Sequence, residues 1–181
     1  MARMITRPAL GDVLVGQGMV SKHTVEQVLN RLRGVSAELG ATMVSEGLLS
    51  EDQLAQALAV QFDLPYDPLT DFRVDSAFYE RLSVKLMQRH PFVPIAEQRG
   101  RLTIAIPDPQ NLLGLDELEL LLGRELDLVV SSKSAILTAL ERSEGSSQAL
   151  RELEAEYRSV LVREDEHGEE ETEVATEETP F

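Results

Sequence analysis

The chain has 181 residues, of which 43% are hydrophobic, and it carries a formal net charge of −15. This length allows one ordinary domain, or two small ones with a tail, around a core built mainly from aliphatic side chains. Because the sequence contains no cysteine, disulfides, thiolate metal sites and cysteine nucleophiles are excluded, and the acidic balance argues against non-specific binding to DNA or RNA.

The charge is distributed unevenly along the chain. Residues 150–181 are strongly acidic, whereas basic residues outnumber acidic ones in residues 1–36. A small anionic ligand or an acidic patch on a partner could be attracted to this N-terminal segment, and ordinary surface scatter is the alternative. No apolar run approaches the roughly 20 residues that span a bilayer, and the N-terminus lacks the apolar centre of a secretory signal. We therefore expect a cytoplasmic protein with no transmembrane segment.

Residues 10–32 and 39–61 are two copies of one pattern, offset by 29 residues. The first copy reads LGDVLVGQGMVSKHTVEQVLNRL and the second reads LGATMVSEGLLSEDQLAQALAVQ. The paired positions include Leu10 and Leu39, Gly11 and Gly40, Gly18 and Gly47, and Leu29 and Leu58. Each copy of a repeat this short needs its twin to bury an apolar face, and two similar units can present a two-fold-like surface to a ligand or partner.

Each copy is predicted to form a short helix, a glycine turn and a longer helix. Gly47 suits a position with positive φ after the short helix. Ser50 and Gln53 form a capping-box pattern for the longer helix, and Ser21 is the N-cap in the first copy. We expect a four-helix module over residues 10–61, closed by the Leu64–Pro65 pair.

The pattern then changes to a mixture of helices and strands. The expected elements are a helix at 75–89, a β-hairpin over 92–106, a helix at 111–122 ending at Gly123, a strand at 125–130, and a helix capped by Ser131 or Ser132. Residues 149–161 are predicted to add a short amphipathic helix, and the acidic remainder is predicted to be disordered. The fold class is α+β, with a helical repeat subdomain at 1–66, an α/β subdomain with three strands at 67–144, and a linker, helix and tail at 145–181.

The tandem LGxxLxxxG units, followed by LPY and by PFVPI and RLTIAIPDPQN, resemble one family. They are similar to the N-terminal domain of type II secretion and type IV pilus assembly ATPases, the MshEN or secretion-ATPase N-domain family. The resemblance covers residues 9 to about 143 and implies a helical repeat module followed by an α/β subdomain. The sequence has no GxxxxGK[ST] segment that could cradle ATP phosphates. We expect a free-standing N-domain or a piece of a longer ATPase, without ATPase activity of its own.

The resemblance also implies a ligand, because in part of this family the paired repeats bind cyclic di-GMP. Helix N-termini can offer N–H groups to phosphates, close glycine packing lets the backbone approach, and leucines can flank purine rings. The candidate ligand-binding residues are Arg7, Leu10, Gly11, Leu14, Gly18, Leu29, Leu39, Gly40, Gly47, Leu54, Leu58 and Gln61. No residue is predicted to be catalytic or to bind a metal.

The family pattern places an arginine before each Leu-Gly pair and a glutamine at the end of each unit. Arginine supplies bidentate donors to a guanine edge or a phosphate. These positions here hold Ala9, Glu38, Leu32 and Gln61. Glu38 would repel an anion unless it pairs with Arg31 or Arg33. The competing interpretation is that the glycines serve turns and helix packing while the leucines form the core.

No nucleophile is paired with a base in the sequence, so we expect no enzyme. The leading hypothesis is a non-catalytic regulatory or adaptor protein that docks onto a protein partner in a type II secretion, type IV pilus or motility machine. Such a protein could be peripheral at the inner membrane through its partner. The alternative is a cyclic di-GMP receptor that uses the tandem repeats.

Overall fold

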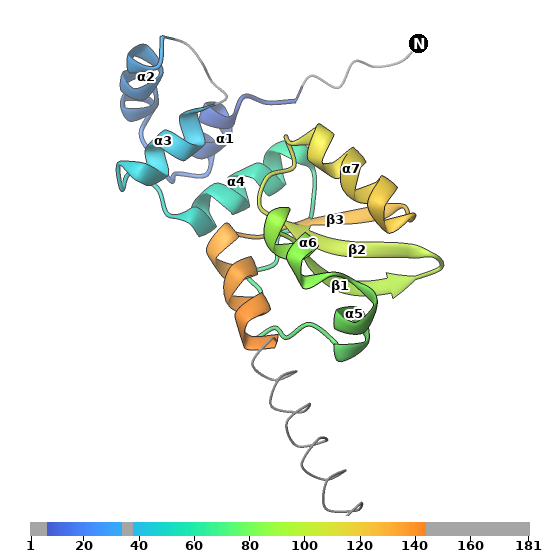
Figure 1. Ribbon diagram of the computed structural model, residues 1–181. Coiled ribbons are helices and arrows are strands. Elements are labelled where there is room, and N and C mark those ends of the chain that lie inside the picture. Colours follow the sequence, from blue (N-terminus) through green and yellow to red (C-terminus); the bar gives the residue numbers. More distant parts are fainter. Residues whose placement is uncertain (1–6, 34–37, 144–181) are drawn as a thin grey trace, which may run out of the picture. The chain divides into compact units, whose positions relative to one another are not determined.

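The computed structural model describes residues 7–33 and 38–143, which belong to one compact unit ending at Ser143. Helices α1 (Leu10–Gly16), α2 (Lys22–Arg31), α3 (Leu39–Ser45) and α4 (Glu51–Phe62) form the N-terminal helical module (Figure 1). The chain continues through α5 (Ser76–Arg81), α6 (Val84–Arg89), β1 (Val93–Gln98), β2 (Arg101–Ile106), α7 (Leu112–Leu122) and β3 (Leu126–Val130). Residues 133–143 form a further helix. The predicted α+β class is confirmed, while the helix and tail predicted beyond residue 144 lie outside the described residues.

The local signals in the two repeats have the predicted effect. The Ser50 hydroxyl accepts a hydrogen bond from the backbone N–H of Gln53, whose side chain accepts one from the backbone N–H of Ser50, completing a capping box. Ser21 caps α2 by accepting from the backbone N–H of Thr24. Because a serine caps the N-terminus of each longer helix, the first turn of each is fixed by residues close in sequence.

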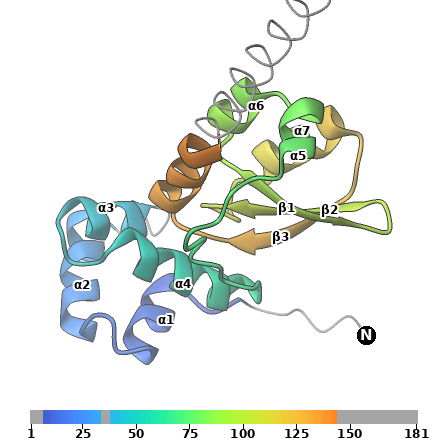
Figure 2. The same ribbon diagram turned by 90° about the horizontal axis from the view of Figure 1, so that it is seen from below.

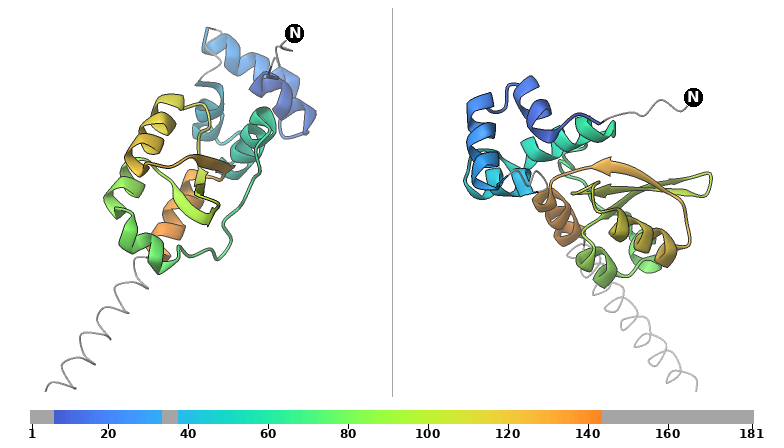
Figure 3. Two further views of the ribbon diagram at one scale, coloured as in Figure 1. Left: turned by 90° about the vertical axis from the view of Figure 1, so that its right-hand side faces the viewer. Right: turned by 90° about the horizontal axis from the view of Figure 1, so that it is seen from above.

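The sheet is small and mixed, with strand order β1-β2-β3. β1 and β2 are antiparallel, joined by Arg99 and Gly100, which both have positive φ as in a type I′ hairpin turn. β2 and β3 are parallel, so α7 forms the crossover between them. Figures 2 and 3 show α5, α6, α7 and the helix at 133–143 on one face of this sheet.

The single helix predicted at 75–89 is wrong, because the structure has two helices, α5 and α6, with a break between them. Leu82 is extended, with φ −114° and ψ 136°, and Ser83 takes the N-cap position of α6. The Ser83 side chain makes no capping hydrogen bond, and the second helix begins with the backbone N–H groups of Leu86 and Met87 donating to the Ser83 carbonyl. Both helices contribute to one core, since Met87 is buried and Phe78 packs against the same cluster.

The helical module is tied to the sheet where α4 leads into it. Tyr66 forms a parallel bridge to Val130 at the end of β3, and the N–H of Val130 donates to the carbonyl of Pro65 at 2.8 Å. A carboxylate oxygen of Glu51, at the start of α4, accepts from the backbone N–H of Ser134 at 3.0 Å. These bonds connect the second repeat to the last strand and to the helix that follows it. In the described part of the chain, no helix is both long and apolar enough to cross a membrane.

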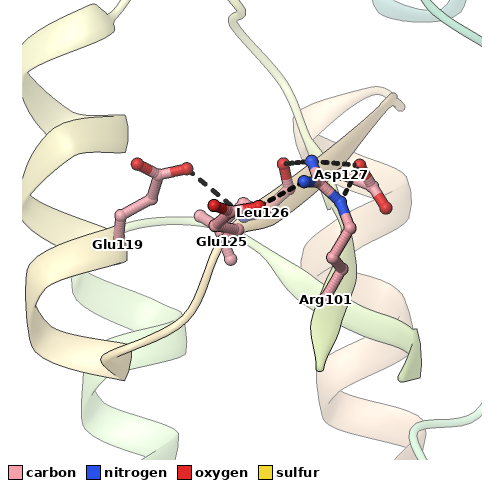
Figure 4. Close-up of polar contacts among 5 residues, drawn as sticks. All are labelled: Arg101, Glu119, Glu125, Leu126 and Asp127. Carbon is pink, nitrogen blue, oxygen red and sulfur yellow. Dashed lines mark hydrogen bonds and ion pairs between the residues drawn. The ribbon is translucent and has the colours of Figure 1, made fainter. Parts of the chain in front are cut away.

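Arg101 of β2 reaches across to β3 on the surface of the sheet (Figure 4). Its Nε and Nη2 atoms donate to Oδ1 of Asp127 at 2.9 and 2.7 Å, and its Nη1 atom donates to Glu125. Beside them, Glu119 of α7 accepts from the backbone N–H of Leu126 at 3.2 Å. The hydrogen bonds from Arg101 lower the pKa of the Asp127 carboxyl. Exposed ion pairs add little stability individually, so these contacts chiefly orient the strands.

Replacing Arg101 with alanine should raise the pKa of Asp127 toward that of a free aspartate, because bonds that favour the charged form are lost. In the native protein this carboxylate contributes stability above its unfolded pKa and loses it as the pH falls through the lowered folded pKa. NMR titration of the side-chain carboxyl carbon measures the pKa. Arg31→Ala, which removes a pair with Glu46 in the helical module, is the control and should leave Asp127 unchanged. An Asp127 titration that is the same in R101A and the native protein would contradict this account.

Candidate functional site

The two copies of the sequence repeat form the same backbone hydrogen bonds at the end of their short helices. The bonds that end α1 run from Gln17 to Val13, Gly18 to Val15 and Met19 to Leu14, and those that end α3 run from Glu46 to Thr42, Gly47 to Val44 and Leu48 to Met43, all at 2.9–3.0 Å. Gly18 and Gly47 have φ of 69° and 71°. Both are exposed with open space around them, so the backbone conformation is what requires glycine there.

The glycine after each leading leucine allows the two helices of one copy to approach closely. A Cβ at Gly11 would lie 2.7 Å from Cγ1 of Val25, and a Cβ at Gly40 would lie 2.6 Å from Cδ1 of Leu54. Both pairs are separated by the same number of residues, so each copy uses the same internal contact. These distances are shorter than carbon atoms tolerate, which explains the glycine at both positions.

The same glycines also form a reciprocal contact between the copies. A Cβ at Gly11 would lie 3.7 Å from Cδ2 of Leu39, and a Cβ at Gly40 would lie 3.3 Å from Cδ2 of Leu10. The leucine of each copy therefore packs over the glycine of the other. This is the contact pattern of a two-fold interface, formed here within one chain.

The predicted ligand-binding leucines mostly lie in the interior. Leu10, Leu14, Leu39 and Leu58 are buried in one core cluster, and Leu29 and Leu54 are half-buried against it. The structure thus brings the leucines and the helix glycines of the candidate set together as packing residues. Their contact with a ligand stays a prediction.

Gln61 and Arg7 join the end of the second copy to the start of the first. The Gln61 Nε2 atom donates to the carbonyl of Pro8 at 3.0 Å, and the Arg7 guanidinium lies over the Phe62 ring at 4.5 Å from its centroid. The Gln61 Oε1 atom is buried and has no hydrogen-bond partner within the described residues. Both side chains therefore hold the segment before α1 against α4, a long-range role that the sequence did not reveal.

The two positions expected to hold arginine are surface N-caps. Ala9 precedes α1 and Glu38 precedes α3, and neither side chain caps its helix. Arg31 makes a bidentate pair with Glu46, at 2.8 and 2.6 Å, rather than with Glu38. The hydrogen bond to Glu46 raises the pKa of Arg31. Of the two arginines that could neutralise Glu38, Arg31 is therefore engaged by Glu46 instead.

A cavity of about 330 Å³ lies beside the second copy. Val44 of α3 and Leu54 of α4 line one side, and Pro107, Ser132 and Lys133 line the other. Leu54 is thus a candidate residue with access to an open cavity. Within residues 7–33 and 38–143, no group of three or more His, Asp or Glu side chains could hold a metal ion.

Sequence reasoning missed the outer face of α7. Leu112, Leu113, Leu120 and Leu121 are exposed there, by 61%, 83%, 83% and 57%. A sign was present in the sequence, because LLGLDELELLL has more leucines than one buried helix face can use.

This geometry defines a class of α+β domain. In this class, two helical repeats pack reciprocally against each other, and a three-stranded sheet follows them in the chain. The chain belongs to the MshEN domain family, whose model matches residues 62–150. A solved structure of MshE with cdg is similar over 75% of this chain and 99% of that chain, with 32% identity and a TM-score of 0.64.

Similar full-length proteins are type IV pilus assembly ATPases named PilB. The one from Thermus thermophilus is 32% identical over 135 residues, which are 74% of this chain and 15% of the ATPase. The one from Myxococcus xanthus is 27% identical over 133 residues, covering 74% of this chain and 24% of the ATPase. The chain spans a quarter or less of the length of these relatives.

Replacing Gly47 with alanine should lower the free energy of unfolding by about 1 kcal/mol, because a side chain disfavours its left-handed conformation. Gly16→Ala is the matched control, since Gly16 is helical and a Cβ there meets open space. That control should be neutral or stabilise by about 0.5–1 kcal/mol. Equilibrium urea unfolding followed by circular dichroism compares them, and equal losses in both variants would contradict the explanation.

Proposed function

We propose that the chain is a non-catalytic regulatory or adaptor module that docks onto a protein partner of a type II secretion, type IV pilus or motility machine. It would act in the cytoplasm, peripheral to the inner membrane through that partner. Family membership and the pilus ATPases among its relatives support the kind of machine. The observation that carries the docking role is that the repeat frame is intact while the two expected arginine positions hold Ala9 and Glu38.

The physical argument is that fold and ligand binding use different residues of the repeat. Gly11, Gly40 and the leading leucines hold the module together, so they are required with or without a ligand. The exposed N-cap positions contribute little packing, yet they are where an arginine would supply paired donors to a guanine or phosphate. Alanine supplies no donor, and Glu38 adds a negative charge that disfavours an anion.

Immobilised full chain should capture a component of a secretion, pilus or motility machine from a native extract of its own host. Bound protein is identified by mass spectrometry after elution with excess untagged chain, which controls for binding to the matrix. A specific partner should appear in this eluate, because untagged chain competes with immobilised chain for a saturable docking site. Recovery of no machine component in the displaced fraction would count against the adaptor role.

A second candidate function is the binding of cyclic di-GMP. It is supported by the similarity to the structure of MshE with cdg and by the retained spacing and hydrogen bonds of both repeats. Arg7 and Gln61 lie together at the junction of the two copies, and the Gln61 Oε1 atom has no partner within the described residues. Under this second candidate function, Arg7 and Gln61 would supply polar contacts to the ligand in the absence of the two expected arginines.

Calorimetric titration with cyclic di-GMP separates the two candidates. Under the adaptor proposal the native chain gives no heat at high-micromolar ligand, whereas Ala9→Arg/Glu38→Arg gains binding because bidentate donors are restored. If the native chain binds, Gln61→Ala should weaken binding about tenfold, the effect of one lost hydrogen bond. Lys22→Ala, an exposed cation elsewhere in the first copy, is the control and should change nothing.

A further inference from the structure

The outer face of α7 exposes an unusual amount of apolar surface. Leu113 and Leu120 are each 83% exposed, and Leu112 and Leu121 extend the same face at both ends. Residues seven apart in a helix lie on one side, two turns apart, so Leu113 and Leu120 project from the same side of α7. Figure 1 shows α7 at the surface of the α/β part. We call these four leucines the α7 ridge.

The fold itself does not use the α7 ridge. The opposite side of the helix packs on the sheet through Leu118, which is buried, and through Leu115 and Leu122, which are partly buried. Single exposed leucines are ordinary, but a run of them along one short helix marks an interaction surface.

The middle of the ridge carries negative charge. Asp116 and Glu117 lie one turn from Leu113 and Leu120 on the same side of the helix, and both are exposed. Asp116 makes no hydrogen bond or ion pair with any described residue, whereas Glu117 has one carboxylate oxygen 3.6 Å from Nε2 of His90. An occupant of the ridge must therefore offer apolar side chains at both ends and positive charge between them.

Charge decides among the possible occupants. A second copy of this chain would bring two such acidic centres together and add to the repulsion between chains of net charge −15. An anionic membrane would be repelled by the same carboxylates. A helix with an apolar face interrupted by lysine or arginine satisfies both the leucines and the carboxylates.

We propose that the α7 ridge is a docking surface for a basic amphipathic helix of a partner protein. This rests on the proposed adaptor function and deepens it, because it names the surface and the chemistry of the partner segment. Leu113 and Leu120 provide the apolar anchors, and Asp116 and Glu117 set the preference for a cationic helix.

The first experiment measures binding of the full chain to a synthetic amphipathic peptide with leucines on one face and two lysines between them, by fluorescence anisotropy. The chain should bind it, and Leu113→Ser/Leu120→Ser should weaken binding about tenfold or more, as expected for central apolar anchors. Val60→Ser/Leu48→Ser is the matched control, because both residues are exposed leucine or valine side chains away from α7. No binding by the native chain, or an equal loss in the control, overturns the proposal.

The second experiment tests the charge preference. Asp116→Lys/Glu117→Lys should lose the lysine peptide and bind the same peptide with glutamates in place of lysines. Asp12→Lys/Glu26→Lys changes the net charge equally at exposed sites in the helical module and should keep the native preference. Equal binding of both peptides by the native chain overturns the proposal, as does a loss of preference in the control.

The third experiment separates this proposal from the function on which it rests. Leu113→Ser/Leu120→Ser is used as bait in the capture from host extract, after circular dichroism confirms that it is folded. Loss of the captured machine component supports the ridge as the docking surface. Retention of that component leaves the adaptor function standing and overturns the ridge, whereas the native chain capturing nothing overturns the adaptor function itself. Native chain that sediments as a dimer dissociated by the serine substitutions, or that binds anionic vesicles through α7, also overturns the proposal.

Discussion

The reciprocal contact between leucine and glycine in the two copies is the constraint on which the helical module depends. Leu10 packs over Gly40 while Leu39 packs over Gly11, so neither copy buries its apolar face alone. A Cβ at either glycine would come within 2.7 Å of a side chain in the other helix of the same copy, so the packing within that copy would have to shift. The two turns have the same geometry, because Gly18 and Gly47 share a positive φ and equivalent hydrogen bonds surround them.

The rest of the described structure is joined to the second copy through α4 and the segment that follows it. The start of α4 accepts a hydrogen bond from the helix at 133–143 through Glu51, and the segment after α4 pairs with Val130. The β2–α7–β3 crossover is held in register by the strand pairing and by Arg101. This arrangement covers one side of α7 with the sheet and leaves the other side exposed.

Packing residues and surface residues occupy separate positions in the two repeats. Gly11, Gly40 and the leading leucines are enclosed by the fold, whereas Ala9 and Glu38 lie on the surface before each short helix. Their side chains can change without disturbing the reciprocal contact. The same holds for the outer leucines of α7, which the sheet does not require. Partner or ligand preference can therefore change while the fold remains.

The sequence by itself determined the features that depend on neighbours along the chain. The repeat, the capping box of Ser50 and Gln53 and the hairpin turn at Gly100 were all predictable, because their hydrogen bonds and dihedral preferences are local. The break at Leu82 was not, since a helical apolar pattern continues through the position where the structure has an extended residue.

Only the tertiary structure decided the remaining features, because each depends on residues distant in sequence. The parallel pairing of β3 with β2 and the bond from Gln61 to Pro8 require the whole chain to be folded. The same holds for the candidate site. The sequence repeat identified the candidate residues, but only the structure showed that most of them pack in the core. The sequence predicted a helix at 111–122, and the position of the sheet decided which of its leucines remained outside.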